Sequence, residues 1–196
     1  MNESQWDKLL HIKTSGRDDS KADQYRYPYE PTPYSVLERL ASEGYMGKRN
    51  CIIDYGCGKG RVDFFLAYQT RCRTIGIEYD ERIYAAAVEN QKTGAAAGRT
   101  AFVLENAEEY EIPPEADRFY FFNPFSVTIL RRVIGRVIES YYAEPREMLL
   151  FFYYPSDEYI SYLMTIEEMM FADEIDCRDL FVGENERERI MVFQIG

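Results

Sequence analysis

A run of glycines between an apolar stretch and an apolar helical pattern is the part of this sequence with the clearest chemical meaning. Residues 51–67 read CIIDYGCGKGRVDFFLA, so that Asp54 is followed by Gly56, Gly58 and Gly60 at every second position. Glycine takes positive φ angles and lets a ligand approach the backbone without side chains in the way. The start of the following helix adds unpaired N–H groups. This spacing predicts a loop that binds a nucleotide-like ligand.

Three kinds of nucleotide-binding loop have a glycine spacing similar to this one. A P-loop is excluded, because the Gly-Lys pair is followed by Gly60 and Ile53 stands where the leading glycine is needed. The dinucleotide fingerprint Gly-x-Gly-x-x-Gly is one residue longer than the spacing found here. The third pattern, acid-x-Gly-x-Gly-x-Gly, is matched at every fixed position by residues 54–60. Glu78 lies about 20 residues further on, where an acid that binds ribose hydroxyls is expected.

The elements that position these residues alternate between strand and helix. Strands are expected at residues 50–55, 74–79, 100–106, 117–123 and 148–154, and helices at 31–44, 61–69, 80–94, 126–142 and 156–170. In the first helix Thr32 fits the cap and Pro33 the first helical position. Segments 172–181 and 189–195 form a terminal hairpin around Gly183 and Glu184. The predicted fold is α/β, with a doubly wound, mostly parallel seven-stranded sheet and a C-terminal antiparallel hairpin.

The N-terminal segment lacks a sustained apolar period. Residues 1–31 are therefore expected to be an irregular extension or lid, in front of a single domain over residues 32–196. Residues 24–34 read QYRYPYEPTPY and combine tyrosines with prolines. This aromatic segment either folds over the ligand and excludes water from the reaction or packs as a strap on the sheet edge.

Composition excludes several classes of protein. The 196 residues carry a formal net charge of -11. This charge disfavours a nucleic-acid partner, because proteins that bind nucleic acids usually present a basic surface to the phosphates. Four cysteines form no Cys-x-x-Cys pair and His11 is the lone histidine, so no metal site is expected. Neither a signal sequence nor a membrane-spanning run is recognised. These features predict a soluble, reduced, cytoplasmic protein that does not bind membranes.

The glycine loop, the acid at the end of the second strand and the terminal hairpin together resemble the class I S-adenosylmethionine-dependent methyltransferases. The resemblance covers residues 32–196 and implies S-adenosyl-L-methionine as the cofactor. Residues expected to contact it from the first motif are Asp54, Tyr55, Gly56, Gly58 and Gly60.

Further contacts with the nucleoside are implied by the same resemblance. Glu78 is expected to hold both ribose hydroxyls, with Tyr79 against the adenine face. Asn106 and Ala107 stand where these families often have an acid and an alanine at the adenine edge. Tyr79 also fits a packing role, and Asn106 is also an ordinary turn residue.

The end of the fourth strand would carry the chemistry. Asn123, Pro124 and Phe125 resemble the Asn/Asp-Pro-Pro-aromatic motif of methyltransferases that modify nitrogen. That motif implies that the Asn123 oxygen accepts a hydrogen bond from the target N–H, while the aromatic face stabilises the positive charge that develops on nitrogen. The second proline is missing, however. A simple turn, in which Pro124 ends the strand and Ser126 caps the helix, also fits the sequence.

The sequence thus predicts a cytoplasmic methyltransferase whose acceptor is a nitrogen of a protein side chain or of a small molecule. A non-catalytic module that binds an adenosyl ligand is one alternative, since the fourth-strand motif is incomplete. An NAD-dependent oxidoreductase is a second alternative, against which the short glycine loop argues. No pattern in the sequence identifies the acceptor or the oligomeric state.

Overall fold

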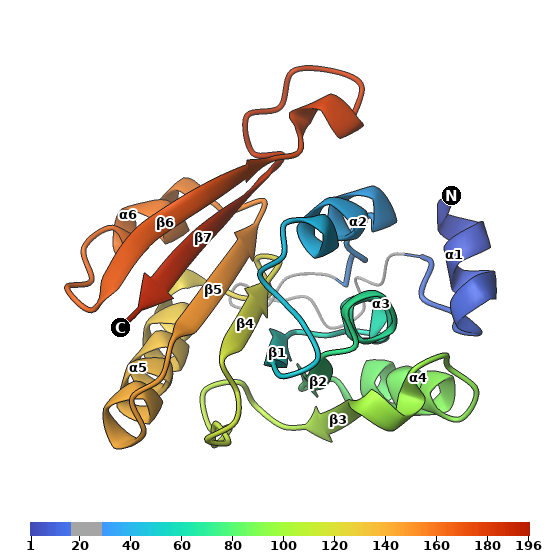
Figure 1. Ribbon diagram of the computed structural model, residues 1–196, viewed down its shortest axis with the longest axis horizontal. Helices are drawn as coiled ribbons and strands as arrows, with labels where there is room; N and C mark the ends of the chain where they lie inside the picture. The colour runs from blue at the N-terminus through green and yellow to red at the C-terminus, as the bar shows by residue number, and fades with distance from the viewer. Residues whose placement is uncertain (17–28) are drawn as a thin grey trace.

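The computed structural model describes residues 1–16 and 29–196, which form a twisted sheet with helices on both faces (Figure 1). The strands are β1 (Cys51–Tyr55), β2 (Arg73–Glu78), β3 (Thr100–Leu104), β4 (Arg118–Phe121), β5 (Met148–Tyr153), β6 (Met169–Asp176) and β7 (Arg189–Ile195). Their order across the sheet is β3-β2-β1-β4-β5-β7-β6. Strand β7 is antiparallel to both neighbours, and the other strands share one direction. The predicted doubly wound sheet with its C-terminal antiparallel hairpin is confirmed.

Two sets of helices cover the sheet. One face carries α1 (Glu3–Leu10), α2 (Tyr34–Ser42) and α3 (Arg61–Thr70), and the other carries α5 (Val127–Ala143) and α6 (Asp157–Leu163). Helix α4 (Glu81–Gln91) lies beside β2 and β3. Alternation along β1 divides its side chains between two cores, with Ile52 in the first and Ile53 and Tyr55 in the second.

The order of the strands reverses beside β1. From β1 the chain moves outward through β2 to β3, and it then returns to the other side of β1 as β4. In such a sheet, ligands bind beyond the carboxyl ends of the strands at this reversal. The glycine loop follows β1, Glu78 ends β2 and Asn123 follows β4. The fold therefore brings the predicted site residues to one edge of the sheet.

Helix α1 corrects the prediction that the N-terminal segment is irregular. Asn2 and Gln5 form a reciprocal capping box that starts this helix. Trp6, Leu10 and Ile12 are buried in the same core as α2 and α3, and the Trp6 ring lies 4.9 Å from that of Phe65. The prediction failed for residues 3–10 because a helix this short has too few apolar positions to show a period.

Some predicted boundaries also need correction. Pro33 is the N-cap of α2 and makes no side-chain cap, while the Thr32 hydroxyl instead shares a hydrogen bond of 3.0 Å with the Tyr120 hydroxyl. Helix α6 ends at Leu163, well before residue 170, because β6 already begins at Met169 and pairs with Ile195. No helix within the described ranges is long and apolar enough to cross a membrane.

Candidate functional site

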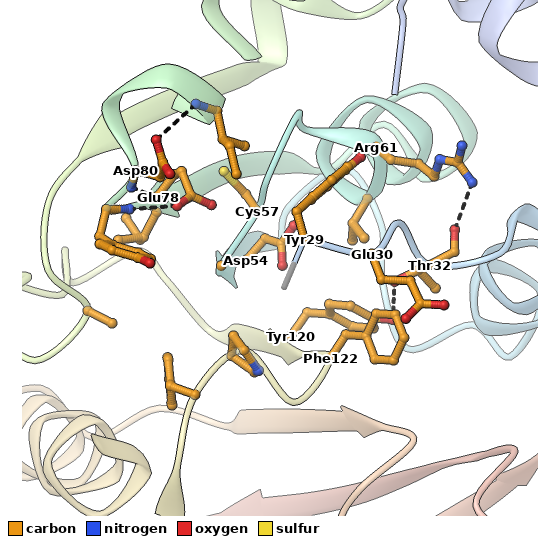
Figure 2. A pocket seen from close by; sticks show the side chains of 18 of the residues that line it. Tyr29, Glu30, Thr32, Asp54, Cys57, Arg61, Glu78, Asp80, Tyr120 and Phe122 are labelled. Atoms are coloured by element: carbon orange, nitrogen blue, oxygen red, sulfur yellow. Dashed lines mark hydrogen bonds between the residues drawn. The ribbon is translucent and has the colours of Figure 1, made fainter. Parts of the chain in front are cut away.

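A cavity of about 90 Å³ lies at the carboxyl ends of β1, β2 and β4 (Figure 2). We call it the glycine-loop cavity. Of the predicted site residues, its walls include Asp54, Gly56, Glu78, Tyr79, Asn106, Ala107, Pro124 and Phe125. Its other wall residues include Tyr29, Glu30, Thr32, Cys57, Arg61, Asp80, Tyr120 and Phe122. The structure thus gathers most of the predicted residues around one hollow.

The backbone of the glycine loop is held against β2. Gly56 N and Cys57 N both donate to the carbonyl of Ile77, at 2.9 and 3.1 Å. Gly56 has a φ of 77° and Gly58 a φ of 57°, a region that side chains disfavour. A Cβ atom at Gly56 would lie 2.6 Å from Pro124 Cβ, across the cavity. These positions therefore need glycine both for conformation and for space.

Gly60 serves a different purpose. A Cβ atom there would lie 2.5 Å from the ring of Phe102 on β3, away from the cavity. Its carbonyl accepts the first hydrogen bond of α3, from Phe64 N at 3.0 Å. Gly60 thus allows α3 to pack closely on the sheet, and it does not line the cavity.

Tyr29 fills the space in front of Gly58. A Cβ atom at Gly58 would lie only 2.1 Å from the Tyr29 ring. The Tyr29 hydroxyl donates to the carbonyl of Thr14 at 2.6 Å, and the Lys59 ammonium lies 4.9 Å from the ring centre. Figure 2 shows this side chain between Asp54 and Arg61. The small volume of the cavity follows from this position. Residues 24–28 of the aromatic segment, with Tyr25 and Tyr27, lie outside the described residues.

Two carboxyl groups are buried beneath the loop. Asp54 is 3% exposed and Asp63, in the first turn of α3, is fully buried. Both Asp63 oxygens and one Asp54 oxygen face no hydrogen-bond donor among the described residues. Burial raises the pKa of Asp54 to about 7, and burial together with the nearby Asp54 charge raises the pKa of Asp63 further. These shifts favour the protonated form of Asp63 next to the Asp54 carboxyl.

Glu78 links the end of β2 to the glycine loop. Its Oε2 accepts from Gly58 N at 3.1 Å, and its Oε1 accepts from Tyr79 N and Asp80 N, both at 2.9 Å. Burial raises the pKa of this carboxyl, while the three N–H donors oppose that shift. Glu78 is therefore fixed by backbone contacts at the cavity wall. A carboxylate has about four lone-pair positions, so capacity remains for a ligand hydroxyl.

The residues predicted to meet the adenine, Tyr79, Asn106 and Ala107, all line the cavity. Tyr79 is exposed. Asn106 starts the turn after β3, since its carbonyl accepts from Glu109 N at 2.9 Å and its Nδ2 donates to Glu108 at 3.2 Å. Both residues therefore combine a local structural role with a position on the wall.

Tyr55 is placed differently from the rest of the first motif. Its side chain is buried in the second core, where its ring stacks on Phe121 at 5.0 Å. The parity of β1 explains this, because Asp54 and Tyr55 are adjacent and must point to opposite faces. The side chain of Tyr55 therefore does not reach the cavity.

The turn after β4 divides the predicted catalytic residues between two hollows. Pro124 and Phe125 line the glycine-loop cavity, whereas Asn123 lines a second cavity beside it. Asn123 has a φ of 39°, and its Nδ2 donates to the carbonyl of Tyr154 at 2.6 Å. Its Oδ1 is buried and has no hydrogen-bond partner among the described residues. Ser126 is the N-cap of α5 but makes no side-chain cap. The turn is thus not explained by helix capping alone.

Arg61 connects the N-terminal segment to the site. This buried residue donates to the Thr14 hydroxyl at 2.7 Å and to the Thr32 carbonyl at 3.2 Å, and it pairs with Glu3. Its guanidinium lies 4.3 Å from the Tyr34 ring centre. These contacts occupy Arg61 with the N-terminal segment.

Two of the site residues that sequence reasoning missed, Asp63 and Tyr29, lie in recognisable patterns. Asp63 is an acid in the first turn of an otherwise apolar helix, which already suggests a buried carboxyl with a special partner. Tyr29, within QYRYPYEPTPY, was named only as part of an aromatic segment with two possible roles. Its contact with Gly58 depends on how the N-terminal segment folds back, which no local pattern encodes.

Comparisons with known proteins bear on this geometry. No model of a known protein family matches the chain. A protein-lysine N-methyltransferase of Saccharolobus islandicus is 33% identical over 87 residues, which are 43% of this chain and 53% of that protein. The match thus spans about half the length of this curated relative.

Solved structures give a broader match. An RNA methyltransferase from Salinibacter ruber in complex with S-adenosyl-L-homocysteine aligns over 85% of this chain and 94% of its own, with a TM-score of 0.57 and 18% identity. The chain has the fold of the class I methyltransferases. A mitomycin 7-O-methyltransferase has a TM-score of 0.63 at 13% identity, covering 83% of this chain and 53% of its own. A dimethyladenosine transferase from Plasmodium falciparum has a TM-score of 0.56 at 13% identity, covering 85% and 63%.

The class I methyltransferase fold therefore confirms the resemblance seen in the sequence. The names of these neighbours include RNA and small-molecule methyltransferases, so the fold alone does not identify an acceptor.

Proposed function

We propose that this protein is a methyltransferase that uses S-adenosyl-L-methionine to methylate a nitrogen atom. The observation that carries the proposal is the contact between Gly58 N and Glu78 Oε2, which joins the glycine loop to an acid at the point where strand order reverses. This arrangement offers a backbone cradle next to two buried carboxyl groups. S-adenosylmethionine has a cationic sulfonium, an amino group and a ribose, which suit these features.

Each part of the cofactor has a matching group on the wall. Asp54 is suited to the cationic methionine half, and the remaining lone pairs of Glu78 are suited to the ribose hydroxyls. Tyr79, Asn106 and Ala107 are suited to the adenine. Gly56 and Gly58 leave the backbone without side chains. A side chain at Gly56 would collide with Pro124, and one at Gly58 would collide with Tyr29.

Binding requires Tyr29 to move. Ligand pockets usually measure about 300–1,000 Å³, and the glycine-loop cavity has about 90 Å³. Tyr29 occupies the space in front of Gly58, so its displacement enlarges the cavity where the methionine half would lie. Tyr29 would thus act as a lid, which gives this part of the predicted extension over residues 1–31 a function.

The turn after β4 suits a nitrogen acceptor. Because Asn123 donates through Nδ2 to Tyr154, its Oδ1, which has no partner among the described residues, is left to accept a hydrogen bond from the target N–H. The acceptor nitrogen forms the new bond to the methyl carbon with its lone pair, while the carbon–sulfur bond breaks and leaves its electron pair on sulfur. A proton from the nitrogen passes to solvent. Positioning accounts for most of the rate in such a reaction, and the Saccharolobus relative, named as a lysine N-methyltransferase, supports nitrogen as the acceptor.

Ligand titration tests the proposal directly. Isothermal calorimetry with S-adenosylmethionine, S-adenosylhomocysteine and NAD should show binding of the first two and none of the third. Tritiated methyl transfer into fractionated lysate, sorted into protein, RNA and small-molecule pools, then tests for catalysis. Binding of NAD alone would contradict the proposal, and tight binding with no labelled fraction would favour the non-catalytic module. The cytoplasm remains the proposed compartment, in keeping with four buried, free cysteines.

A further inference from the structure

The second cavity, of about 570 Å³, lies beside the glycine-loop cavity at the same edge of the sheet. Both cavities have Glu30 and Phe122 in their walls. The turn after β4 lies between them, since Asn123 lines the second and Pro124 lines the first. A donor in the first cavity and an acceptor in the second would therefore meet at this turn.

Aromatic rings form much of the second cavity. Phe122, Tyr153, Tyr154 and Phe181 all line it. The Phe122 ring lies 4.7 Å from that of Tyr153 and 6.4 Å from that of Tyr154, so the rings at the end of β4 and β5 form one continuous wall. Aromatic faces attract cations and also bury aliphatic chains. The cavity thus suits a ligand with an apolar stem and a positive end.

Glu188 places a fixed negative charge in this wall. Its backbone is held on both sides, because its N–H donates to Asn185 at 3.1 Å and its carbonyl accepts from Cys177 at 2.9 Å. Its Oε2 accepts from the Tyr153 hydroxyl at 2.7 Å. Burial raises the pKa of Tyr153, which keeps this phenol protonated as a donor. The carboxylate is therefore oriented before any ligand arrives.

No cation in the wall neutralises this charge. Within residues 1–16 and 29–196, neither Glu188 nor Glu30 forms an ion pair. Arg187 also lines the cavity, but its N–H groups donate to the carbonyls of Pro155 and Tyr154 at 3.2 and 3.1 Å. Its guanidinium is stacked over the Tyr154 ring at 4.1 Å. The wall therefore combines the two carboxylates and the rings with the Arg187 guanidinium, which backbone carbonyls hold against Tyr154.

We propose that this second cavity is the acceptor site and that it takes a primary amine at the end of an aliphatic chain, with Glu188 as the specificity-determining residue. This inference rests on the methyl transfer proposed above. The amine enters as an ammonium, held by Glu188 and the aromatic wall. It loses one proton to solvent, and the neutral amine then presents an N–H to the free Oδ1 of Asn123 and its lone pair to the methyl group. Phosphate-bearing acceptors are disfavoured, because the wall carries two carboxylates, Glu30 and Glu188, against the one guanidinium of Arg187.

The variant Glu188→Gln tests this inference, because glutamine keeps the shape and still accepts a hydrogen bond from Tyr153. Glu186→Gln is the matched control, since Glu186 is exposed two residues away and does not line the cavity. Methyl transfer is measured with a short peptide that contains one lysine, with the same peptide carrying norleucine, with spermidine and with an RNA oligonucleotide. The lysine peptide and spermidine distinguish a protein side chain from a small amine as the source.

We expect methylation of the lysine peptide, of spermidine or of both, and none of the norleucine peptide. Glu188→Gln should raise the KM for the amine by about tenfold or more with little change in kcat, and Glu186→Gln should change neither. Calorimetric titration of the amine into the S-adenosylhomocysteine complex should show the same loss of affinity without any turnover.

The two proposals fail in different ways. If S-adenosylmethionine does not bind, the proposed function is wrong, and the acceptor inference, which depends on it, is wrong too. If the cofactor binds but no amine is methylated, if RNA alone is methylated, or if Glu188→Gln equals wild type on every amine, the acceptor inference is overturned and the proposed function stands. Circular dichroism of each variant confirms that it is folded.

Discussion

Replacing Asp54 with asparagine should make the ligand-free protein more stable, and most clearly at alkaline pH. In the folded protein, burial raises the pKa of Asp54 from 3.8 to about 7. A carboxyl whose folded pKa is raised contributes stability below its unfolded pKa, and this contribution is lost as the pH rises toward the folded pKa. The wild-type protein should therefore lose stability between about pH 4 and about pH 7. Asparagine does not ionise and should not show this loss.

The magnitude follows from the two pKa values. A tenfold change in an ionisation constant corresponds to about 1.4 kcal/mol, so the complete loss from Asp54 is about 4 kcal/mol. Between about pH 5.5 and about pH 8.5 the wild-type protein should lose about 2 kcal/mol of stability through Asp54. The rest of the Asp54 contribution is already lost at the lower pH. The stability of Asp54→Asn relative to wild type should therefore rise by about 2 kcal/mol over this interval.

Equilibrium urea unfolding at the two pH values measures this difference. Asp117→Asn is a suitable control, because Asp117 accepts hydrogen bonds from Asn50 and from Cys51 N at the opposite edge of the sheet, at 2.7 and 3.0 Å. That variant should lower stability at both pH values. If Asp54→Asn differs from wild type by the same amount at both, or is relatively less stable at the higher pH, Asp54 does not carry the buried charge argued above. The same variant should bind S-adenosylmethionine more weakly, since the cation loses its partner.

Three further substitutions test separate parts of the argument. Gly58→Val places a side chain where the Tyr29 ring lies, at a φ of 57° that disfavours valine. It should lower the affinity for S-adenosylmethionine by about 10- to 100-fold. An unchanged affinity by calorimetry would show that the loop is not part of the binding site. Asn123→Ala should leave cofactor affinity intact and reduce kcat by roughly tenfold or more. A kcat equal to that of the wild type would show that residues 123–125 are a structural turn without a catalytic role. Trp6→Ala should lower the free energy of unfolding, measured in urea, by about 3 kcal/mol. Leu9→Ala, on the exposed side of α1, should change this free energy little. Equal effects of the two substitutions would contradict the burial of α1 in the core.

The sheet could be predicted because its signals are local. Each buried strand is an apolar run, and β5 is buried along its whole length, which marks it as central. The glycine spacing and Glu78 were recognised for the same reason, since a loop and the acid at the next strand end have fixed spacing in the chain. Helix α1 was missed because its stability comes from Trp6 and Leu10 meeting distant residues of α2 and α3.

Side-chain direction limited the prediction of the site. A strand alternates its side chains, so the motif that contains Asp54 and Tyr55 sends one into the cavity and the other into the opposite core. The position of Tyr29 over Gly58 depends on a chain reversal, and its contribution to the cavity could not be inferred from the composition of the aromatic segment. The raised pKa values of Asp54 and Asp63 likewise depend on a helix start that lies next to a strand end.

The separation between the proposed donor and acceptor sites has a physical origin in the sheet. The donor side is built from the ends of β1 and β2, whose geometry is constrained by backbone hydrogen bonds and by glycine. The acceptor side is built from side chains at the ends of β4 and β5 and at the start of β7, which lies beside them because β7 is antiparallel. Glu188 precedes β7 by one residue and Tyr153 ends β5, so their hydrogen bond exists only because the hairpin folds back. If the two proposals hold, substitutions in this half should change the acceptor without disturbing the loop that binds the methyl donor.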